Sequence, residues 1–309
     1  MNCPRCARRT AAARGTCIYC GETLPITRIE SAPPQRKIDS FEQAFNTILE
    51  PAFPYTSLAA ETALAVALGV EPEEAHAYIA SGKRIPIARS QNRQEAAMIA
   101  ALVRDCGLNA VVIADEDLML KREMVRARRV VIEGDSLQVH HSGGAMTLPV
   151  AEIKLLVAGA LKGNRVDYTE GIVGIRGQSG NVLDSSEFRS DEMLMDVYSS
   201  SLARSFRIKS DAFDYSGLVS PLSFRAEVNF KAAIAKLREL ASRAAFDDDF
   251  TRVKDLLARA WPERSRNEAR GVKRKGLAYR PVAQASLISD NRDQFERYSR
   301  LMFVSINRR

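Results

Sequence analysis

The stretch SQNRQEAAMIAALVRDCGLNAVVIA, residues 90–114, decides the fold class of the central part of the chain. As far as Gly107, apolar residues recur at the three- and four-residue spacing that places them on one face of a helix. The residues on this face are Ala96, Ile99, Ala100, Val103 and Cys106. Ser90 can cap this helix, and the apolar run NAVVIA that follows predicts a strand. The stretch therefore predicts a helix followed by a strand, as in mixed α/β domains.

The residues before this stretch predict more elements of the same kind. Residues 58–68 and 72–81 each predict a helix that is followed at once by a glycine. The run RIPIA at 84–88 predicts a short strand. A short helix is predicted over 41–48, with a capping residue just before it. Together, residues 40–118 are expected to form a small α/β domain.

This order of elements resembles a known domain. The phrases EPEEAHAYIASG (71–82) and NRQEAAMIAALVRDCGLNAVVI (92–113) are similar to the C-terminal domain of the bacterial ribosomal stalk protein. In that family the helix pair meets translation factors, and its factor-binding helix carries lysines. The second helix here has Glu73, Glu74 and His76 instead, so the resemblance implies the fold and not factor binding. A generic ferredoxin-like interaction module is the alternative interpretation.

Four of the five cysteines lie within the first 20 residues and have the spacing C-x2-C-x10-C-x2-C. They are Cys3, Cys6, Cys17 and Cys20. Each pair can aim two sulfurs at one ion, and two pairs supply the tetrahedral thiolate set that Zn²⁺ prefers. Because four thiolates leave no position for water, we expect one structural zinc ion. The doubled pair argues against a thioredoxin-like redox site. Iron in a rubredoxin-like site stays open, since spacing alone does not choose the metal.

The same residues resemble the short zinc ribbon found at the N-terminus of many bacterial proteins, and the likeness covers residues 1–24. Ala7 stands where this family often has glycine, whereas Gly21 permits a positive φ after the second pair. A ribbon of this size cannot bury enough apolar surface to fold alone, so metal binding is expected to supply its folding free energy. The fifth cysteine, Cys106, is interpreted as a small core residue.

Composition limits the class of protein. The chain has 309 residues, of which 46% are hydrophobic, as expected for two or three globular domains. No apolar run reaches the roughly 18 residues that a membrane span needs, and the Arg-rich N-terminus lacks the apolar core of a signal peptide. A cytoplasmic protein is therefore expected, in a compartment where thiols stay reduced.

The net charge of +7 is unevenly distributed. Residues 1–38 contain seven Lys and Arg against two Asp and Glu, and residues 259–309 contain thirteen against five. Basic ends on an acidic body predict contact with an anionic partner, such as nucleic acid, lipid headgroups or an acidic protein. The alternative is that these ends only aid solubility. The Pro- and Ser-containing stretch 25–39 is predicted to be an extended linker.

From about Arg126 the apolar period changes to two, which predicts strands. The predicted strand segments are RRVVIEG, SLQVHHS, AMTLPVAEIKLLVAGAL, and residues 165–170, 192–200 and 205–216. An amphipathic helix is predicted over 223–242. This order, and the phrase GDSLQVHHSGGAMTLPVAEIKLL, resemble a bacterial pleckstrin-homology-like barrel closed by a helix, covering 123–243. The first hairpin has the acidic sequence EGDS, so lipid binding is not carried over from eukaryotic relatives.

Residues 244–309 predict a C-terminal helix and a basic arm. A helix is expected over 245–264, because an acid run begins it and Pro262 ends it. Residues 263–280 are basic and lack an apolar stripe, so they are expected either to bind a polyanion while disordered or to remain solvated. The apolar end of the chain, from residue 293, is expected to pack on a domain or to bind a partner.

The sequence contains no catalytic motif: no Gly-x-Ser-x-Gly, no His-Glu-x-x-His, no phosphate loop and no dinucleotide fingerprint. The glycine-rich segment 171–181 is interpreted as a mobile loop between strands. His140 and His141 are adjacent on a predicted strand, so they point to opposite faces and cannot share a metal ion.

The fold class that follows is an α+β multidomain protein: a zinc ribbon, a small α/β domain, a barrel-like β domain closed by a helix, and a helical basic C-terminal arm. The expected function is non-enzymatic, a zinc-binding adaptor whose partners are proteins. The alternative is a nucleic-acid-binding regulator that uses the ribbon and the basic C-terminal arm. An enzyme whose site is not encoded by a motif is the third hypothesis. The oligomeric state is left open.

Overall fold

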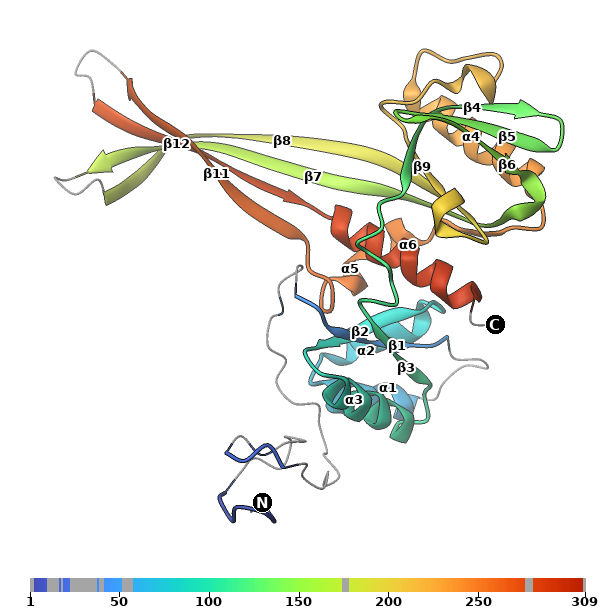
Figure 1. The fold of residues 1–309 in the computed structure, drawn as a ribbon. Helices are drawn as coiled ribbons and strands as arrows, with labels where there is room; N and C mark the ends of the chain where they lie inside the picture. The colour runs from blue at the N-terminus through green and yellow to red at the C-terminus, as the bar shows by residue number, and fades with distance from the viewer. Residues whose placement is uncertain are drawn as a thin grey trace. The chain divides into compact units, whose positions relative to one another are not determined.

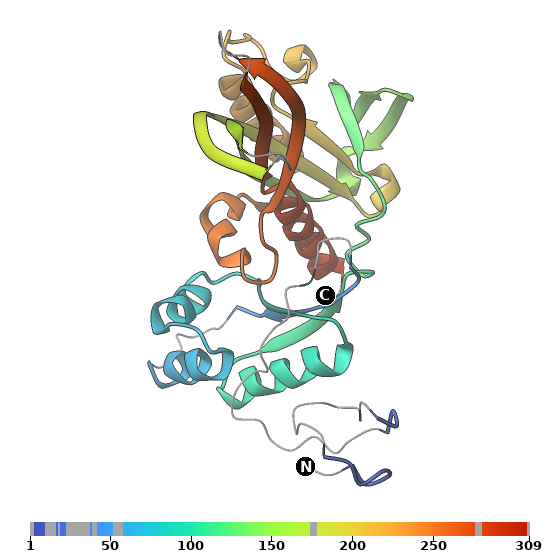
Figure 2. The same cartoon turned by 90° about the vertical axis from the view of Figure 1, so that its left-hand side faces the viewer.

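The computed structural model describes residues 3–9, 17, 19–22, 38, 42–51, 58–173, 178–275 and 280–307. The chain divides into two compact units. The first consists of Met1–Leu120 with Val253–Pro262, and the second of Lys121–Arg252 with Glu263–Arg309 (Figure 1, Figure 2). Within the described residues there are six α-helices and twelve strands, so the protein is of the mixed α/β kind. The predicted linker 25–39 lies outside the described residues, apart from Ile38.

The first unit contains a three-stranded antiparallel sheet in the order β2-β1-β3. Its elements are β1 (Phe45–Leu49), α1 (Leu58–Leu68), α2 (Pro72–Ala80), β2 (Ile85–Ser90), α3 (Arg93–Asp105) and β3 (Ala110–Ala114). The predicted order of helix, helix, strand, helix, strand from residue 58 onward is confirmed.

Helix α3 follows the predicted pattern except at its start. Ala96, Ile99, Ala100 and Val103 are all buried, as the apolar spacing predicted. The N-cap is Asn92 and not Ser90: the Asn92 side chain accepts a hydrogen bond of 2.8 Å from the backbone N–H of Glu95. Ser90 is instead the last residue of β2. The predicted cap was therefore wrong by two residues, because either polar residue suits the position.

Residues 45–49 form the central strand β1, and the helix predicted over 41–48 was wrong. This strand pairs with β2 on one side and with β3 on the other, and its last four residues are buried, so side chains on both faces are covered. Its sequence FNTIL does not alternate between apolar and polar residues, so periodicity alone could not identify it as a strand. The Thr47 hydroxyl donates to the carbonyl of Ala96 at 3.2 Å, which ties β1 to α3.

A buried polar network also crosses the first unit. Asn46 donates to the carboxylate of Asp115 at 2.8 Å, and Arg89 donates to the other oxygen of the same carboxylate at 2.6 Å. The indole N–H of Trp261 donates to Asn46 at 2.7 Å. Each of these side chains is almost fully buried. The network thus attaches the returning segment Val253–Pro262 to the sheet of this unit.

The second unit is built on a nine-stranded sheet in the order β11-β12-β7-β8-β9-β4-β5-β6, with β10 paired in parallel to β7. The strands are β4 (Val125–Glu133), β5 (Ser136–His141), β6 (Gly144–Pro149), β7 (Ile153–Val173), β8 (Gln178–Ser199), β9 (Phe206–Lys209), β10 (Ala245–Asp247), β11 (Arg264–Lys275) and β12 (Arg280–Asp290). The predicted hairpin strands before residue 150 are confirmed. Among the described strands, the path ends at β11 and β6 without joining them.

Other predictions for this unit need correction. Residues 165–170 and 192–200 lie in strands, as predicted, but the strands are much longer: β7 has 21 residues and β8 has 22. Most of the segment 171–181 lies in the same two strands, and residues 174–177 are outside the described part of the chain. Residues 264–275 form strand β11 and are not an unstructured basic arm, because β12 provides a complete backbone partner.

Helix α4 (Ala226–Leu240) confirms the predicted amphipathic helix. Its Phe230, Ala233 and Leu237 pack in a core cluster with side chains of β4 to β9. The helix predicted over 245–264 was too long: α5 spans only Phe250–Leu257 and shares its residues between the two units. The end of the chain forms helix α6 (Arg292–Asn307).

Helix α6 is attached to the sheet by close aromatic packing and by a hydrogen bond to a buried carboxylate. A Cβ atom on Gly159 of β7 would lie 2.7 Å from the ring of Phe250 and 2.8 Å from that of Phe295, so this contact requires glycine. Arg207 of β9 donates twice to Asp196 of β8, at 2.6 and 2.8 Å. Ser299 of α6 donates to the same carboxylate at 2.6 Å.

Beyond this core, four strands continue as a projection of the second unit (Figure 1). We call it the sheet extension and define it as residues 163–173, 178–192, 264–275 and 280–290. All its pairings are antiparallel. No helix of the described residues is long and apolar enough to cross a membrane.

Candidate metal centre

Two turns of the same geometry carry the four N-terminal cysteines. In the first, the N–H of Cys3 donates to the carbonyl of Arg8 at 3.0 Å, and the N–H of Ala7 donates back to the carbonyl of Cys3 at 2.9 Å. In the second, the N–H of Cys17 donates to the carbonyl of Glu22 at 2.8 Å, and the N–H of Gly21 donates to the carbonyl of Cys17 at 2.9 Å. The equivalent spacing of the cysteines therefore produces two equivalent knuckles.

Both knuckles need a positive φ at the residue after the second cysteine. Gly21 adopts a φ of 71° and Ala7 a φ of 56°. The left-handed region is open to glycine, but for alanine it costs about 1 kcal/mol. The first knuckle is therefore strained at Ala7.

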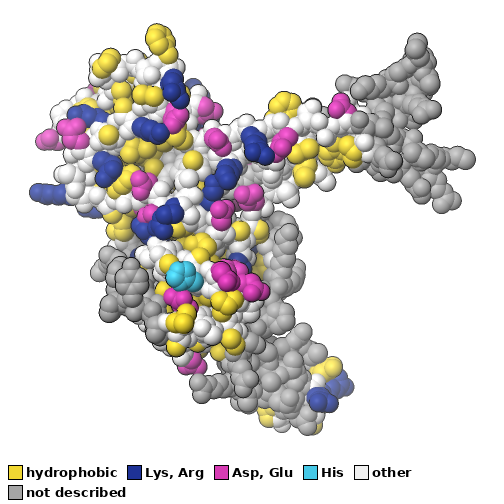
Figure 3. Space-filling view, turned by 180° about the vertical axis from the view of Figure 1, so that it is seen from behind, with side chains coloured by type: hydrophobic (Ala, Val, Ile, Leu, Met, Phe, Trp, Pro, Cys, Tyr) yellow, Lys and Arg dark blue, Asp and Glu magenta, His cyan; other side chains and the backbone are white. Residues whose placement is uncertain are grey.

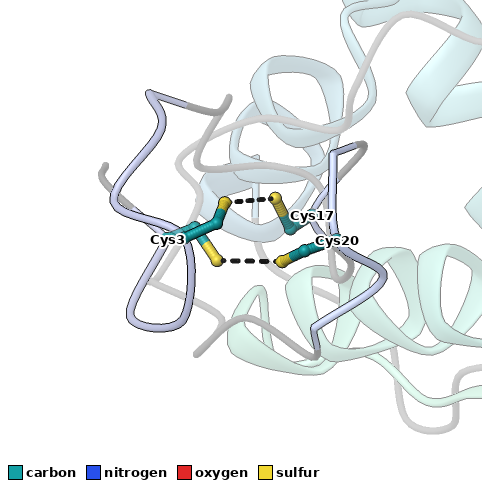
Figure 4. A group of neighbouring side chains, drawn as sticks. Cys3, Cys17 and Cys20 are labelled. Atoms are coloured by element: carbon teal, nitrogen blue, oxygen red, sulfur yellow. Dashed lines mark hydrogen bonds between the residues drawn. The ribbon is translucent and has the colours of Figure 1, made fainter.

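The knuckles face each other and bring all four sulfurs together (Figure 4). The sulfurs of Cys3 and Cys20 are 3.6 Å apart, as are those of Cys6 and Cys17. All four lie within 4.8 Å of one another, and none is in a disulfide. Cys3 and Cys17 are buried, while Cys6 and Cys20 are half-buried. Each close pair joins one knuckle to the other.

This cluster can hold one metal ion, and its dimensions fit zinc. Zn–S bonds of about 2.3 Å in a tetrahedron place sulfurs about 3.8 Å apart, which lies within the observed range. The donor set of four thiols, two on each side, matches a closed structural site. Such a site leaves no coordination position for a substrate.

The thiols differ in acidity because of their local hydrogen bonds. The pKa of Cys17 is lowered to about 7, mainly by a hydrogen bond from the backbone N–H of Tyr19. The pKa of Cys20 is raised to about 12. The backbone N–H of Glu22 opposes this rise, but desolvation and the neighbouring sulfurs outweigh it. Metal ligation requires thiolates, so a low pKa at Cys17 favours the first metal–sulfur bond.

Two side-chain contacts also link the knuckles. The guanidinium of Arg5 lies 3.4 Å from the carboxylate of Glu22, and that of Arg8 lies over the ring of Tyr19, 4.9 Å from its centre. Both pairs are exposed, so each contributes little to stability.

The remaining candidate residues lie apart from this cluster. Cys106 is half-buried at the end of α3, where its Sγ donates to the carbonyl of Leu102 at 3.2 Å. His76 lies 3.0 Å from Glu61 with an exposed ring. His141 accepts a hydrogen bond from the backbone N–H of Gly143. His140 and His141 occupy successive positions of β5. None of these belongs to a group of three or more metal-binding side chains in the described part of the protein.

Comparison with family models, with curated proteins and with solved structures found no match to this chain. The resemblances to the stalk-protein domain and to pleckstrin-homology-like barrels therefore stay predictions. What the protein does has to be inferred from its own residues.

Proposed function

We propose that this chain is a non-enzymatic, zinc-binding adaptor that binds another protein through its sheet extension. Its four N-terminal cysteines would hold one structural zinc ion and so fold the ribbon. The two units would provide the scaffold from which the sheet extension reaches a partner.

One observation carries this proposal: the outer strands of the sheet extension, β8 and β11, have described stretches that are exposed on both faces. Successive residues of a strand point to opposite faces, yet all side chains from Asp184 to Asp191 of β8 are exposed. The same holds for Arg264–Ala269 of β11. A sheet in a single globular domain normally buries at least one face. Two exposed faces are typical of a surface that is covered by a partner.

Apolar side chains on this surface support the same conclusion. Phe188 is 56% exposed, Val182 57% and Leu287 41%. Figure 3 shows hydrophobic side chains on the described part of the sheet extension. Exposed aromatic and aliphatic groups of this kind are the anchors of protein interfaces.

A non-enzymatic role agrees with the chemistry of the described side chains. His76 contacts the carboxylate of Glu61, His141 contacts the backbone amide of Gly143, and the clustered cysteines supply four ligands to one site. A general base next to a nucleophile would be the mark of catalysis.

The test is affinity capture from the native cell with the full chain as bait. The variant Phe188→Ser with Leu287→Ser removes two anchors of the sheet extension. The matched control is Phe224→Ser, which removes a fully exposed phenylalanine outside it. The proposal expects proteins retained by the wild type and the control to be lost with the double variant, and the purified partner to bind directly. Retention of the same proteins by the double variant would contradict it.

A second candidate function is nucleic-acid binding, favoured by the basic character of β11. Arg264 and Arg266 are exposed there, and the sequence RSRNEARGVKRK contains six basic residues and one acid. Binding to random duplex and single-stranded nucleic acid should then weaken steeply as salt increases, because each neutralised phosphate releases counterions. No binding at low salt would exclude this candidate.

A further inference from the structure

The sheet extension has two outer edges in the described structure, formed by β8 and β11. In the order β11-β12-β7-β8, the outer side of β8 pairs with β9 only from Leu194 to Val197. From Gln178 to Glu192, no described strand pairs with that side. The outer side of β11 has no described strand partner along its length. Such edges present backbone N–H and C=O groups that can pair with another strand.

The two edges carry opposite charge. The described outer part of β8 contains three exposed acids and one exposed arginine, which are Asp184, Glu187, Asp191 and Arg189. Strand β11 contains six basic residues and one acid, and its described Arg264 and Arg266 have side chains that are 55% and 52% exposed. Like edges therefore repel each other, whereas β8 and β11 attract. Opposite charges on facing strands stabilise a pairing and fix which edges meet.

We propose that the sheet extensions of two copies of this chain pair edge to edge, with the acidic β8 edge of one copy against the basic β11 edge of the next. The result is one continuous sheet across copies, held by backbone hydrogen bonds and selected by charge.

Strand direction suits this pairing. The pairs β11–β12, β12–β7 and β7–β8 are all antiparallel, so β8 runs opposite to β11 within one copy. When two copies lie side by side and point the same way, β11 of one is therefore antiparallel to β8 of the other. No copy has to be turned over, because the number of strands in the extension is even.

The edges also match in position along the extension. Arg264 pairs with Asp290, which pairs with Gly163, which pairs with Ser190 of β8. At the other end, Val272 is connected in the same way, through Ala283 and Glu170, to Val182. Residues 264–272 of β11 therefore lie at the same height along the extension as Val182 to Ser190 of β8. Strand β9 pairs with β8 only as far as Leu194, so the outer side of β8 from Val182 to Ser190 is available to a second copy.

Pairing would cover apolar surface that is now in water. Phe188 and Val182 lie on the β8 edge itself and are more than half exposed. A strand added beside them would cover part of both side chains, which adds a hydrophobic gain to the backbone pairing.

This contact is head-to-tail, since two different edges meet. Repetition gives either a closed ring, in which no edge is left, or an open chain that grows with concentration. Both forms have more than one copy per particle, and both weaken when salt screens the charged edges.

The inference goes beyond the adaptor function, and the two can fail separately. It is tested on the purified full chain alone, by light scattering behind size-exclusion chromatography and by sedimentation, at about 50 mM and about 500 mM salt. The wild type is expected to form multiples of its 34.2 kDa mass at low salt and to dissociate at high salt. A monomer at low salt would overturn the inference and leave the adaptor function untouched.

Two charge-reversal variants make the test specific. Asp184→Lys with Glu187→Lys makes both edges basic, and Arg264→Glu with Arg266→Glu makes the first half of the β11 edge, residues 264–269, acidic like β8. Each variant alone is expected to be monomeric, and an equal mixture is expected to associate again, because the β8 edge of each variant is then opposite in charge to the β11 edge of the other. Association of either variant alone at the wild-type level, or a mixture that stays monomeric, would refute edge pairing.

The matched control for the β8 variant is Glu227→Lys with Glu239→Lys, the same change of charge on the exposed side of α4. It should associate like the wild type. The substituted side chains are all at least partly exposed and their ion pairs are weak, so circular dichroism and thermal unfolding should show intact folds for every variant.

Discussion

The buried carboxylate of Asp115 offers the sharpest test of the first unit. It accepts hydrogen bonds from Arg89 at 2.6 Å and from Asn46 at 2.8 Å, and the side chains of this ion pair are 5% and 3% exposed for Arg89 and Asp115. The substitution Asp115→Ala removes both bonds. It leaves the guanidinium of Arg89 buried without its counter-ion.

The expected loss of stability depends on the hydrogen bonds that Arg89 keeps in the variant. Removing one partner of a buried ion pair usually costs about 3–5 kcal/mol. Arg89 keeps hydrogen bonds to the carbonyls of Ile38 and Glu42, at 3.2 and 2.7 Å, which compensate in part. We therefore expect a loss near the lower limit, about 3 kcal/mol. With a urea dependence of about 1–3 kcal/mol per M, the unfolding midpoint should decrease by about 1–3 M.

The assay uses the single tryptophan of the chain. Trp261 is buried in the same unit and donates to Asn46, so its fluorescence reports unfolding of the network itself. The double variant Arg89→Met with Asp115→Leu removes both charges and should be more stable than Asp115→Ala, because no charge is left buried.

The neighbouring exposed acid provides the control. Glu116→Ala removes the same charge one residue further along, and it should change the free energy of unfolding by less than about 0.5 kcal/mol. Equal urea midpoints for Asp115→Ala and Glu116→Ala would refute the reasoning.

Three other predictions concern the metal centre and the second unit. Reduced protein should bind about one zinc ion per chain, as measured by elemental analysis. In the presence of a chelator, the variants Cys6→Ser and Cys17→Ser should lose this zinc, whereas Cys106→Ser should keep it. Ala7→Gly should bind zinc about fivefold more tightly in a chelator competition, since it relieves about 1 kcal/mol of backbone strain, and Gly21→Ala should bind correspondingly more weakly. Gly159→Ala should lower the stability of the second unit by about 1–3 kcal/mol in thermal unfolding, because its methyl group would overlap Phe250 and Phe295. The exposed Gly143→Ala, with contacts no closer than 3.4 Å, should be close to neutral.

Elements whose side chains are buried on one face were predictable from the sequence. The apolar stripes of α3 and α4 identified both helices, and each buries the face that its pattern indicated. Strand β1 was missed because it is buried on both sides and has no alternation. The Asp115 network was missed as well: Asn46, Arg89 and Trp261 are far apart in the sequence, and no pattern connects them before the chain is folded.

The cysteine cluster was predictable for a different reason. Its geometry is almost entirely local, since each knuckle is closed by hydrogen bonds between residues four and five positions apart. Spacing alone therefore brought the two sulfurs of each pair together, whereas the meeting of the two knuckles joins residues 11 and 17 positions apart.

The sheet extension could not be predicted from the sequence. Its strands bury little, so neither an apolar stripe nor an alternation had to be present, and the basic run of β11 had the composition of a solvated tail. What orders this run is a backbone ladder with β12, a partner that side-chain patterns do not reveal. The ordering of this run also changes what its charges can bind. On a disordered tail they would only repel one another and attract any polyanion, but in a strand alternate residues such as Arg264 and Arg266 lie on one face at a fixed spacing. A row of charge can choose one complementary edge over others, and the acidic edge of β8 is the complement that this protein itself provides.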